Sequence, residues 1–317
     1  MRKSVLGLIF LALASGRNSD SIQQAVDIAD GVPRKTIDTD KLGTNAFAND
    51  ARFGTPQQQF QEVSATLGLH YVRILANWDD GSDPGPSAPP NFGFLDSVVG
   101  SLPPDVDAII VMTGTPSWLK NPSSWTGGSP ATTFVNQWVA PIAARYSSNP
   151  RVIGLQVWNE PNQNNADNQL MGFTTSAEAY VSMLRLAYGT IRAESPTKLV
   201  LTAATTSINQ NFPTSLDYNR AMRDAGAQDL ADVWAIHFYG KQYENVIRPR
   251  GVQDFVSGLH LPVWVTESGA QGVNAQLAYG EEVWPYLVDT MPKIERIYVY
   301  QFTEEDRKST RLNSSHI

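Results

Sequence analysis

The sequence contains no cysteine and only four histidines, at positions 70, 237, 260 and 316. Without cysteine the chain can form no disulfide, no thiolate metal site and no cysteine nucleophile. No two histidines lie four residues apart, which argues against a zinc site on one helix face. We therefore expect a protein that works without a metal or another cofactor.

Positive charge is also scarce. The 24 Lys and Arg residues are outnumbered by 31 Asp and Glu residues, which gives a net charge of −7. A nucleic-acid partner is not expected, because binding to phosphates requires a basic surface.

The sequence also has no Gly-x-Ser-x-Gly motif, which argues against a lipase or esterase.

The N-terminus has the pattern of a secretory signal peptide. Arg2 and Lys3 precede an apolar run from Val5 to Ala14, and small residues follow as far as Gly16. The run is too short to span a bilayer, and a basic start with a small-residue end is typical of a cleaved signal. We predict a signal peptide over residues 1–16 and a protein secreted to the extracellular or periplasmic space, free of the membrane after cleavage.

The C-terminus is different from the rest of the chain. Asp306–Ile317 is polar and has no apolar period. These residues resemble the translation of a sequencing-library adapter, so we predict a non-native tail over 306–317. The natural domain would then span residues 17–305.

Within that domain, short β-rich runs alternate with longer helical stretches, and 42% hydrophobic residues are enough for one large core. Helices are expected over 55–67, 132–146 with a kink at Pro141, 176–194, 215–225 and 276–290. The eight expected strands are 42–45, 71–75, 106–112, 152–158, 199–204, 233–237, 263–266 and 296–301. This pattern predicts a (β/α)8 TIM barrel. A doubly wound sheet is disfavoured, since no glycine-rich loop follows the first strand. No segment after the last strand supplies an eighth helix, so we expect the barrel to lack it through truncation.

Two glutamates follow apolar strands directly. Glu160 ends the fourth strand and Glu267 ends the seventh. A carboxylate that continues a buried run is costly unless it is paired or functional. The C-terminal strand ends meet at one mouth of a barrel, where active groups lie. Two carboxylates facing each other there suit the cleavage of a glycosidic bond.

The motifs around these glutamates resemble those of clan A glycoside hydrolases. Trp158-Asn159-Glu160-Pro161 and Trp264-Val265-Thr266-Glu267 match the signatures of strands four and seven. With Arg73 and His237-Phe238-Tyr239, the set is most similar to families 5 and 39, the cellulase-like retaining β-glycosidases. The likeness extends over the whole barrel, from about Leu42 to Gln301.

This resemblance implies a role for each residue. Glu160 would be the acid/base and Glu267 the nucleophile, while Asn159 would bind the sugar 2-hydroxyl. Arg73 and Tyr239 would hold Glu267 ionised and oriented, and His237 would line the site. Arg73 as an ordinary ion-pair partner and His237 as a wall residue are the alternatives. Asn159 and Glu160 are consecutive, so both can reach the site only if the strand ends or bulges there.

Aromatic residues near the strand ends are candidates for stacking on sugars. Trp78 and Trp118 fall in loops after the second and third strands, although packing within those loops is an alternative. Tyr300 stands where clan members often carry a tryptophan that supports the sugar. Trp264 lies an odd number of positions before Glu267, so we expect it to point outward to the helices.

The sequence therefore predicts a secreted hydrolase that cleaves β-glycosidic bonds of a poly- or oligosaccharide with retention of configuration. The expected partner is a carbohydrate, and the oligomeric state is open. Endo action is favoured. Exo-acting β-glycosidase activity, transglycosylation at the same site and an inactive, truncated carbohydrate-binding barrel are the alternatives.

Overall fold

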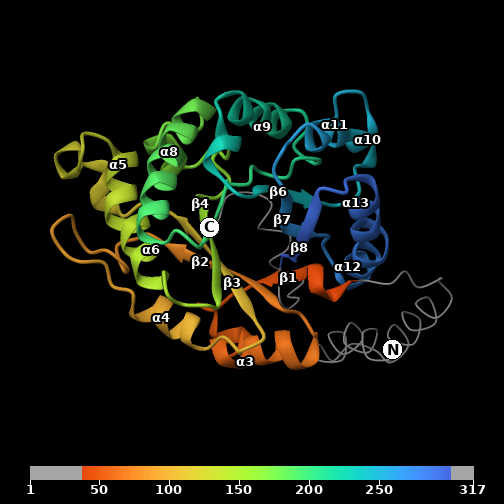
Figure 1. The fold of residues 1–317 in the computed structure, drawn as a ribbon, viewed down its shortest axis with the longest axis horizontal. Coiled ribbons are helices and arrows are strands. Elements are labelled where there is room, and N and C mark those ends of the chain that lie inside the picture. Colours follow the sequence, from red (N-terminus) through yellow and green to blue (C-terminus); the bar gives the residue numbers. More distant parts are fainter. Residues whose placement is uncertain (1–37, 301–317) are drawn as a thin grey trace.

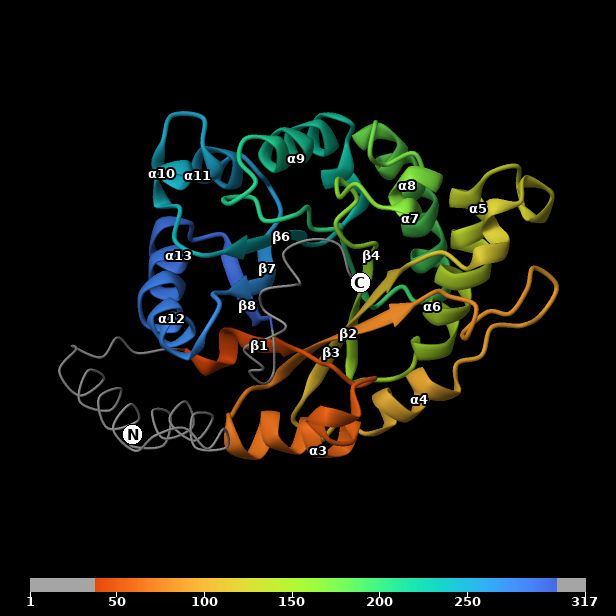
Figure 2. The same ribbon diagram turned by 180° about the vertical axis from the view of Figure 1, so that it is seen from behind.

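The computed structural model describes residues 38–300, and within them eight parallel strands form a barrel surrounded by helices (Figures 1 and 2). The sheet order is β5-β4-β3-β2-β1-β8-β7-β6, and a parallel bridge between Leu201 and Val233 joins its two edges. The strands are β1 (Leu42–Asn45), β2 (Tyr71–Asn77), β3 (Asp107–Thr113), β4 (Val152–Val157), β5 (Leu199–Leu201), β6 (Trp234–Tyr239), β7 (Val263–Gly269) and β8 (Ile294–Val299). The predicted (β/α)8 architecture is confirmed.

Three predictions concern residues outside the described range. These are the signal peptide over 1–16, the non-native tail over 306–317 and the absence of an eighth helix after Tyr300. Between residues 38 and 300, no helix is long and apolar enough to cross a membrane.

The helices lie between the strands along the chain. Their bounds are α3 (Pro56–Gln61), α4 (Gly93–Gly100), α5 (Pro130–Phe134), α6 (Ala140–Tyr146), α7 (Ala166–Leu170), α8 (Ala177–Glu194), α9 (Thr214–Asp224), α10 (Tyr243–Ile247), α11 (Val252–Ser257), α12 (Val273–Ala278) and α13 (Trp284–Thr290). Helix α8 begins as predicted, because the Ser176 side chain accepts a hydrogen bond from the Ala179 N–H.

Two predicted helices are interrupted by a wider, π-helical turn just before a proline. The turn Val135–Val139 precedes Pro141, and the turn Tyr279–Val283 precedes Pro285. Proline has no N–H to donate and its ring crowds the carbonyl four residues earlier. A widened turn relieves both problems without ending the helix, which accounts for the irregularity expected at Pro141.

A bulge in β7 changes which side chains face the inside of the barrel. Ile236 pairs with Val265 but His237 pairs with Glu267, so Thr266 is the extra residue. The extra residue reverses the alternation of side chains, and Trp264 and Glu267 can therefore face the same side. The prediction that Trp264 points outward to the helices is wrong for this reason.

Trp264 belongs to an apolar layer in the barrel interior. The layer gathers residues from strands all around the barrel, which only the interior can do. Its buried members are Ile109, Leu201, Val233, Trp264 and Tyr298. The Arg296 guanidinium lies 3.4 Å from the centre of the Tyr71 ring and 4.1 Å from that of Trp264. This packed layer lies beneath the mouth where β4 and β7 end.

Gly43 on β1 makes room for this layer. A Cβ atom at Gly43 would lie 2.7 Å from Tyr298 Cδ1 and 2.8 Å from Tyr71 Cβ. We therefore expect Gly43→Ala to lower the free energy of unfolding by about 1–3 kcal/mol through overpacking. Urea unfolding monitored by tryptophan fluorescence measures this change.

The matched control is Gly189→Ala on the exposed face of α8, where a Cβ atom would meet no described atom within 4 Å. There the same substitution should raise the free energy of unfolding by about 0.5–1 kcal/mol, because alanine is the better helix former. A Gly43→Ala variant as stable as the wild type would contradict the tight packing described for β1.

Candidate active site

The chain leaves its regular strand conformation where β4 ends. Trp158 and Glu160 both have positive φ angles, of 74° and 43°. Such angles are unfavourable for non-glycine residues and concentrate at functional sites. The Trp158 ring turns into the core, with its indole N–H bonded to Asn168, while Asn159 and Glu160 both contact residues of the barrel mouth. The expected strand break is confirmed.

The Arg73 side chain on β2 connects four strand ends. It is 4% exposed, and its guanidinium donates to Glu267 Oε1 at 2.6 Å and to Asn159 Oδ1 at 2.6 Å. It also donates to Asn45 Oδ1 at 2.8 Å and to Gln156 Oε1 at 2.9 Å. A buried guanidinium is stable only when it is paired and hydrogen-bonded. Arg73 is thus more than an isolated ion-pair partner.

Glu267 is held as an anion. It is 8% exposed, and its second oxygen accepts a hydrogen bond from the Tyr239 hydroxyl at 2.8 Å. Burial acts to raise the pKa of Glu267, but His237, Arg73 and the Tyr239 hydrogen bond outweigh it, so its pKa lies below the ordinary value. A buried but ionised carboxylate can act as a nucleophile.

Glu160 faces the same point from β4. Its Oε1 lies 2.9 Å from His237 Nδ1, and the same nitrogen lies 3.5 Å from Glu267 Oε2. One oxygen of each glutamate and a ring nitrogen of His237 all lie within 4.8 Å of one another. This spacing is shorter than the roughly 6.5–9.5 Å that inverting glycosidases need for a water molecule.

The same three side chains are also the group that could hold a metal ion among the residues the structure describes. Both oxygens of Glu267 already accept hydrogen bonds from outside this group, Oε1 from Arg73 and Oε2 from Tyr239. The arrangement therefore suits proton transfer and nucleophilic attack between two carboxylates.

Aromatic rings border Glu267. The Tyr300 ring lies edge-on to Tyr239, with 6.1 Å between ring centres, and edge-on to Phe47 at 5.6 Å. Tyr300 is thus placed beside the candidate nucleophile, where contact with a sugar is geometrically possible. Its role in substrate binding stays a prediction.

Trp78 does not line the mouth of the barrel, and the prediction that it contacts substrate is wrong. It is 0% exposed, and Trp118, Phe134 and Trp138 pack against it. Its indole N–H is bonded to Asp83 Oδ2 at 2.8 Å. Packing within the loop, the alternative for this residue, accounts for it. Trp118 is half-buried, and its N–H donates to the Asp83 carbonyl, so it at least anchors the same loop.

Three further residues support the site and were not predicted. Asn45 and Gln156 bind the Arg73 guanidinium from β1 and β4. Asn168 donates to the carbonyls of Glu160 and Gln163 and accepts from Trp158. A polar Gln156 within an apolar strand was the available signal. Nothing in the sequence distinguishes Asn168 from its neighbours in an asparagine-rich loop.

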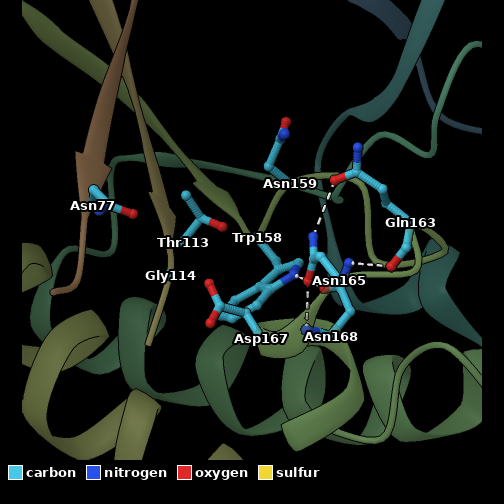
Figure 3. A pocket seen from close by; sticks show the side chains of 9 residues that line it. All are labelled: Asn77, Thr113, Gly114, Trp158, Asn159, Gln163, Asn165, Asp167 and Asn168. Carbon is cyan, nitrogen blue, oxygen red and sulfur yellow. Dashed lines mark hydrogen bonds between the residues drawn. The ribbon is translucent and has the colours of Figure 1, made fainter. Parts of the chain in front are cut away.

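A polar pocket that includes Asn159 lies at the ends of β2, β3 and β4 (Figure 3). Its enclosed space is about 10 Å³, room for about one water molecule. Its lining residues are Asn77, Thr113, Gly114, Trp158, Asn159, Gln163, Asn165, Asp167 and Asn168. Only Asn159 belongs also to the Arg73 network.

Comparison with known proteins gives a consistent family. A family model described as Cellulase (glycosyl hydrolase family 5) matches residues 35–300. The endo-1,4-β-mannanase from Rhizomucor miehei has a TM-score of 0.62 at 17% identity, over 85% of this chain and 88% of that chain. The hyperthermostable endo-1,4-β-D-mannanase from Thermotoga petrophila RKU-1 has a TM-score of 0.58 at 14% identity, over 82% and 88%.

The catalytic domain of GH30 xylanase C from Talaromyces cellulolyticus has a TM-score of 0.56 at 16% identity, over 84% of this chain and 68% of that chain. No curated protein sequence matches the chain. At these identities the solved structures support the barrel fold. The family model confirms the resemblance to clan A, family 5, that the strand-end motifs indicate.

The buried Asp83, which accepts the hydrogen bond from the Trp78 indole, should make the stability of the fold depend on pH. Burial raises the pKa of Asp83, against the opposing hydrogen bonds from Trp78 and Gly85. A carboxyl with a raised pKa binds its proton more tightly in the folded chain, so stability falls as pH rises above about 4, the pKa of unfolded Asp.

Asp83→Asn keeps an acceptor for Trp78 and has no charge to bury. Between pH 4 and pH 7 the wild type should therefore lose stability relative to this variant in urea unfolding. An equal difference at both pH values would show that Asp83 does not titrate in this way.

Proposed function

Because the chain belongs to glycosyl hydrolase family 5 and is thus a retaining glycoside hydrolase, we propose that Glu160 and Glu267 carry out its double displacement on a β-linked poly- or oligosaccharide. The observation that carries the proposal is the pair itself. The two carboxylates approach within 4.8 Å, and only Glu267 is bound by a guanidinium. The different surroundings give the two glutamates different roles.

In the first step a Glu267 oxygen attacks the anomeric carbon of the sugar. The bond to the leaving oxygen breaks, and that oxygen takes the proton of Glu160. The product is a glycosyl ester of Glu267 and a free sugar chain. Arg73 and Tyr239 support this step because they keep Glu267 ionised and fix the direction of its oxygens.

In the second step a water molecule gives its proton to the Glu160 carboxylate and attacks the same carbon. The ester bond breaks and Glu267 is released as a carboxylate. Each attack inverts the configuration at the anomeric carbon, so the two attacks together restore it. His237 supports both steps by holding the Glu160 carboxyl through its 2.9 Å contact. Arg73 orients Asn159 through a hydrogen bond, and we assign Asn159 to the sugar 2-hydroxyl.

We propose cleavage within a chain rather than at its end. The two endo-acting mannanases among the structural neighbours support this choice. The aromatic rings of Phe47 and Tyr300 extend from Tyr239 toward the β1 side of the mouth and give a sugar chain further surface beyond the reacting unit.

The two glutamates are tested by isosteric substitution. Glu160→Gln should lower kcat by about 10²–10⁴-fold on natural polysaccharides, since the proton donor is lost. On a dinitrophenyl glycoside, this variant should form the glycosyl ester at close to the wild-type rate, because that leaving group needs no proton. Glu267→Gln should lose activity on both substrates.

The control is Glu194→Gln at the exposed end of α8, which should keep wild-type kinetics. Steady-state and burst kinetics on both substrates separate these cases. Wild-type turnover by either active-site variant, with the unfolding midpoint unchanged, would contradict the assigned roles.

The pH profile tests the role of Tyr239. Activity requires ionised Glu267, so it is lost as pH falls through the pKa of this carboxyl. Tyr239→Phe removes a hydrogen bond that lowers the pKa of Glu267. We expect the acid limb of kcat/KM to move upward by about one pH unit, as the loss of a hydrogen bond to a charged group implies. Tyr218→Phe, whose hydroxyl donates to the Phe173 carbonyl, should leave the limb in place. An acid limb that is identical in Tyr239→Phe and the wild type would rule out this role.

A further inference from the structure

We propose that Asn209, in the loop that follows β5, is a positioning residue for the nucleophile. Its side chain holds the backbone of Tyr239, so that the tyrosine hydroxyl stays directed at Glu267. This inference rests on the proposed function, in which Glu267 attacks the sugar.

Strand β6 extends well beyond the strand beside it. It continues to Tyr239 at the barrel mouth, whereas β5 ends at Leu201, near the start of β6. The N–H and C=O of one residue in a parallel strand point to the same neighbouring strand, and successive residues alternate between the two neighbours. The Gly240 N–H donates to the Gly269 carbonyl on β7, so the polar backbone groups of Tyr239 point to the side where β5 has ended. They need partners from the loop after β5.

The side chain of Asn209 provides both partners. Its Oδ1 accepts from the Tyr239 N–H at 3.2 Å, and its Nδ2 donates to the Tyr239 carbonyl at 2.6 Å. A side-chain amide has the same kinds of donor and acceptor as a peptide group, so Asn209 pairs with Tyr239 as a residue of a neighbouring strand would. We call this pair of hydrogen bonds the Tyr239 clamp. Ser207 Oγ supports it by accepting from the same N–H at 3.1 Å.

Asn209 is itself fixed in one orientation. It is 0% exposed, and its Oδ1 also accepts from the Ser207 hydroxyl at 2.7 Å. Its Nδ2 also donates to Gln242 Oε1 at 3.1 Å, and its carbonyl accepts from the Asn245 side chain at 2.9 Å. A buried amide whose donors and acceptor are all satisfied cannot turn without losing hydrogen bonds. The clamp can therefore hold the backbone that it binds.

The clamp affects Glu267 through the position of the Tyr239 ring. The tyrosine hydroxyl donates to Glu267 Oε2 at 2.8 Å. Burial and the nearby Glu267 charge raise the pKa of Tyr239 well above its ordinary value, so the hydroxyl remains a donor. Hydrogen bonds weaken steeply when their alignment is lost. A shift of the Tyr239 backbone would therefore leave the Glu267 anion less stabilised.

The charged and titratable groups around Glu267 come from four sides of the barrel mouth. They are Arg73 on β2, Glu160 after β4, His237 and Tyr239 on β6, and Tyr300 after β8. Within residues 38–300, Tyr239 is the member of this set that hydrogen-bonds to the Asn209 side chain. A change at Asn209 should therefore reach Glu267 through Tyr239.

The test is the pKa of Glu267, measured by NMR on protein labelled with ¹³C at the glutamate carboxyl groups and assigned with the Glu267→Gln variant. Asn209→Ala should raise this pKa by about 0.5, because the hydrogen bond from Tyr239 is misaligned but not removed. In the Tyr239→Phe background the same substitution should give no further rise. A rise that persists there would show that the loop acts through another contact, such as the Ile208 N–H to the His237 carbonyl, and would overturn the proposal.

Thr133→Ala is the matched control. Thr133 on α5 is also 0% exposed, and its hydroxyl accepts from the backbone N–H of Thr126 at 2.8 Å. Its replacement should lower the free energy of unfolding, as the loss of a buried hydrogen bond does, and leave the pKa of Glu267 unchanged.

If Asn209→Ala does not fold, Ser207→Ala replaces it. This variant removes one of the two acceptors of the Tyr239 N–H and should raise the pKa of Glu267 by a smaller amount, about 0.2. A Glu267 pKa equal to that of the wild type in each variant that folds would overturn the proposal.

Kinetics separate the clamp from the assignment of the nucleophile. An acid limb of kcat/KM that moves upward together with the pKa of Glu267 supports both. A higher pKa with an unmoved acid limb supports the clamp and contradicts the role of Glu267 in the proposed function. An unchanged pKa overturns the clamp even if Glu267 proves to be the nucleophile.

Discussion

The buried guanidinium of Arg73 is the constraint around which the barrel mouth is organised. A positive charge with so little exposure must have its hydrogen bonds satisfied by protein groups. Asn45, Gln156, Asn159 and Glu267 provide them from β1, β4 and β7. Because these partners come from separate strands, the barrel must close in one register for all of them to meet. The ionised state of Glu267 follows from the same pairing.

Two local irregularities bring the carboxylates to the guanidinium. The positive φ angles around Glu160 end β4 early, and the bulge at Thr266 rotates Glu267 into the barrel. In regular strands, the alternation of side chains would have turned Glu160 or Glu267 away from the mouth. The cost of these conformations is offset by the buried packing of Trp158 and its bond to Asn168. The site therefore depends on strained segments that a rigid barrel supports.

Much of this arrangement could be predicted from the sequence. Apolar runs alternating with helical patterns indicated the barrel, and glutamates continuing two of those runs indicated the mouth. The orientation of Trp264 could not be predicted, and the burial of Trp78 was one of two alternatives between which the sequence did not decide. The first depends on a bulge that no turn residue announces, and the second on loops folding back over the indole. The support from Asn168 depends on contacts between segments that sequence spacing does not specify.

The central claim is that Glu267 forms the covalent bond to the sugar. Trapping with activated 2-deoxy-2-fluoro glycosides of the gluco and manno series, followed by peptide mass spectrometry, tests it most directly. The fluorine slows both steps, and the activated leaving group lets the first step proceed, so the ester accumulates. Our account predicts a mass increase of one fluorosugar on the peptide that contains Glu267. A label on Glu160, or turnover of the reagent with no labelled peptide, would contradict it.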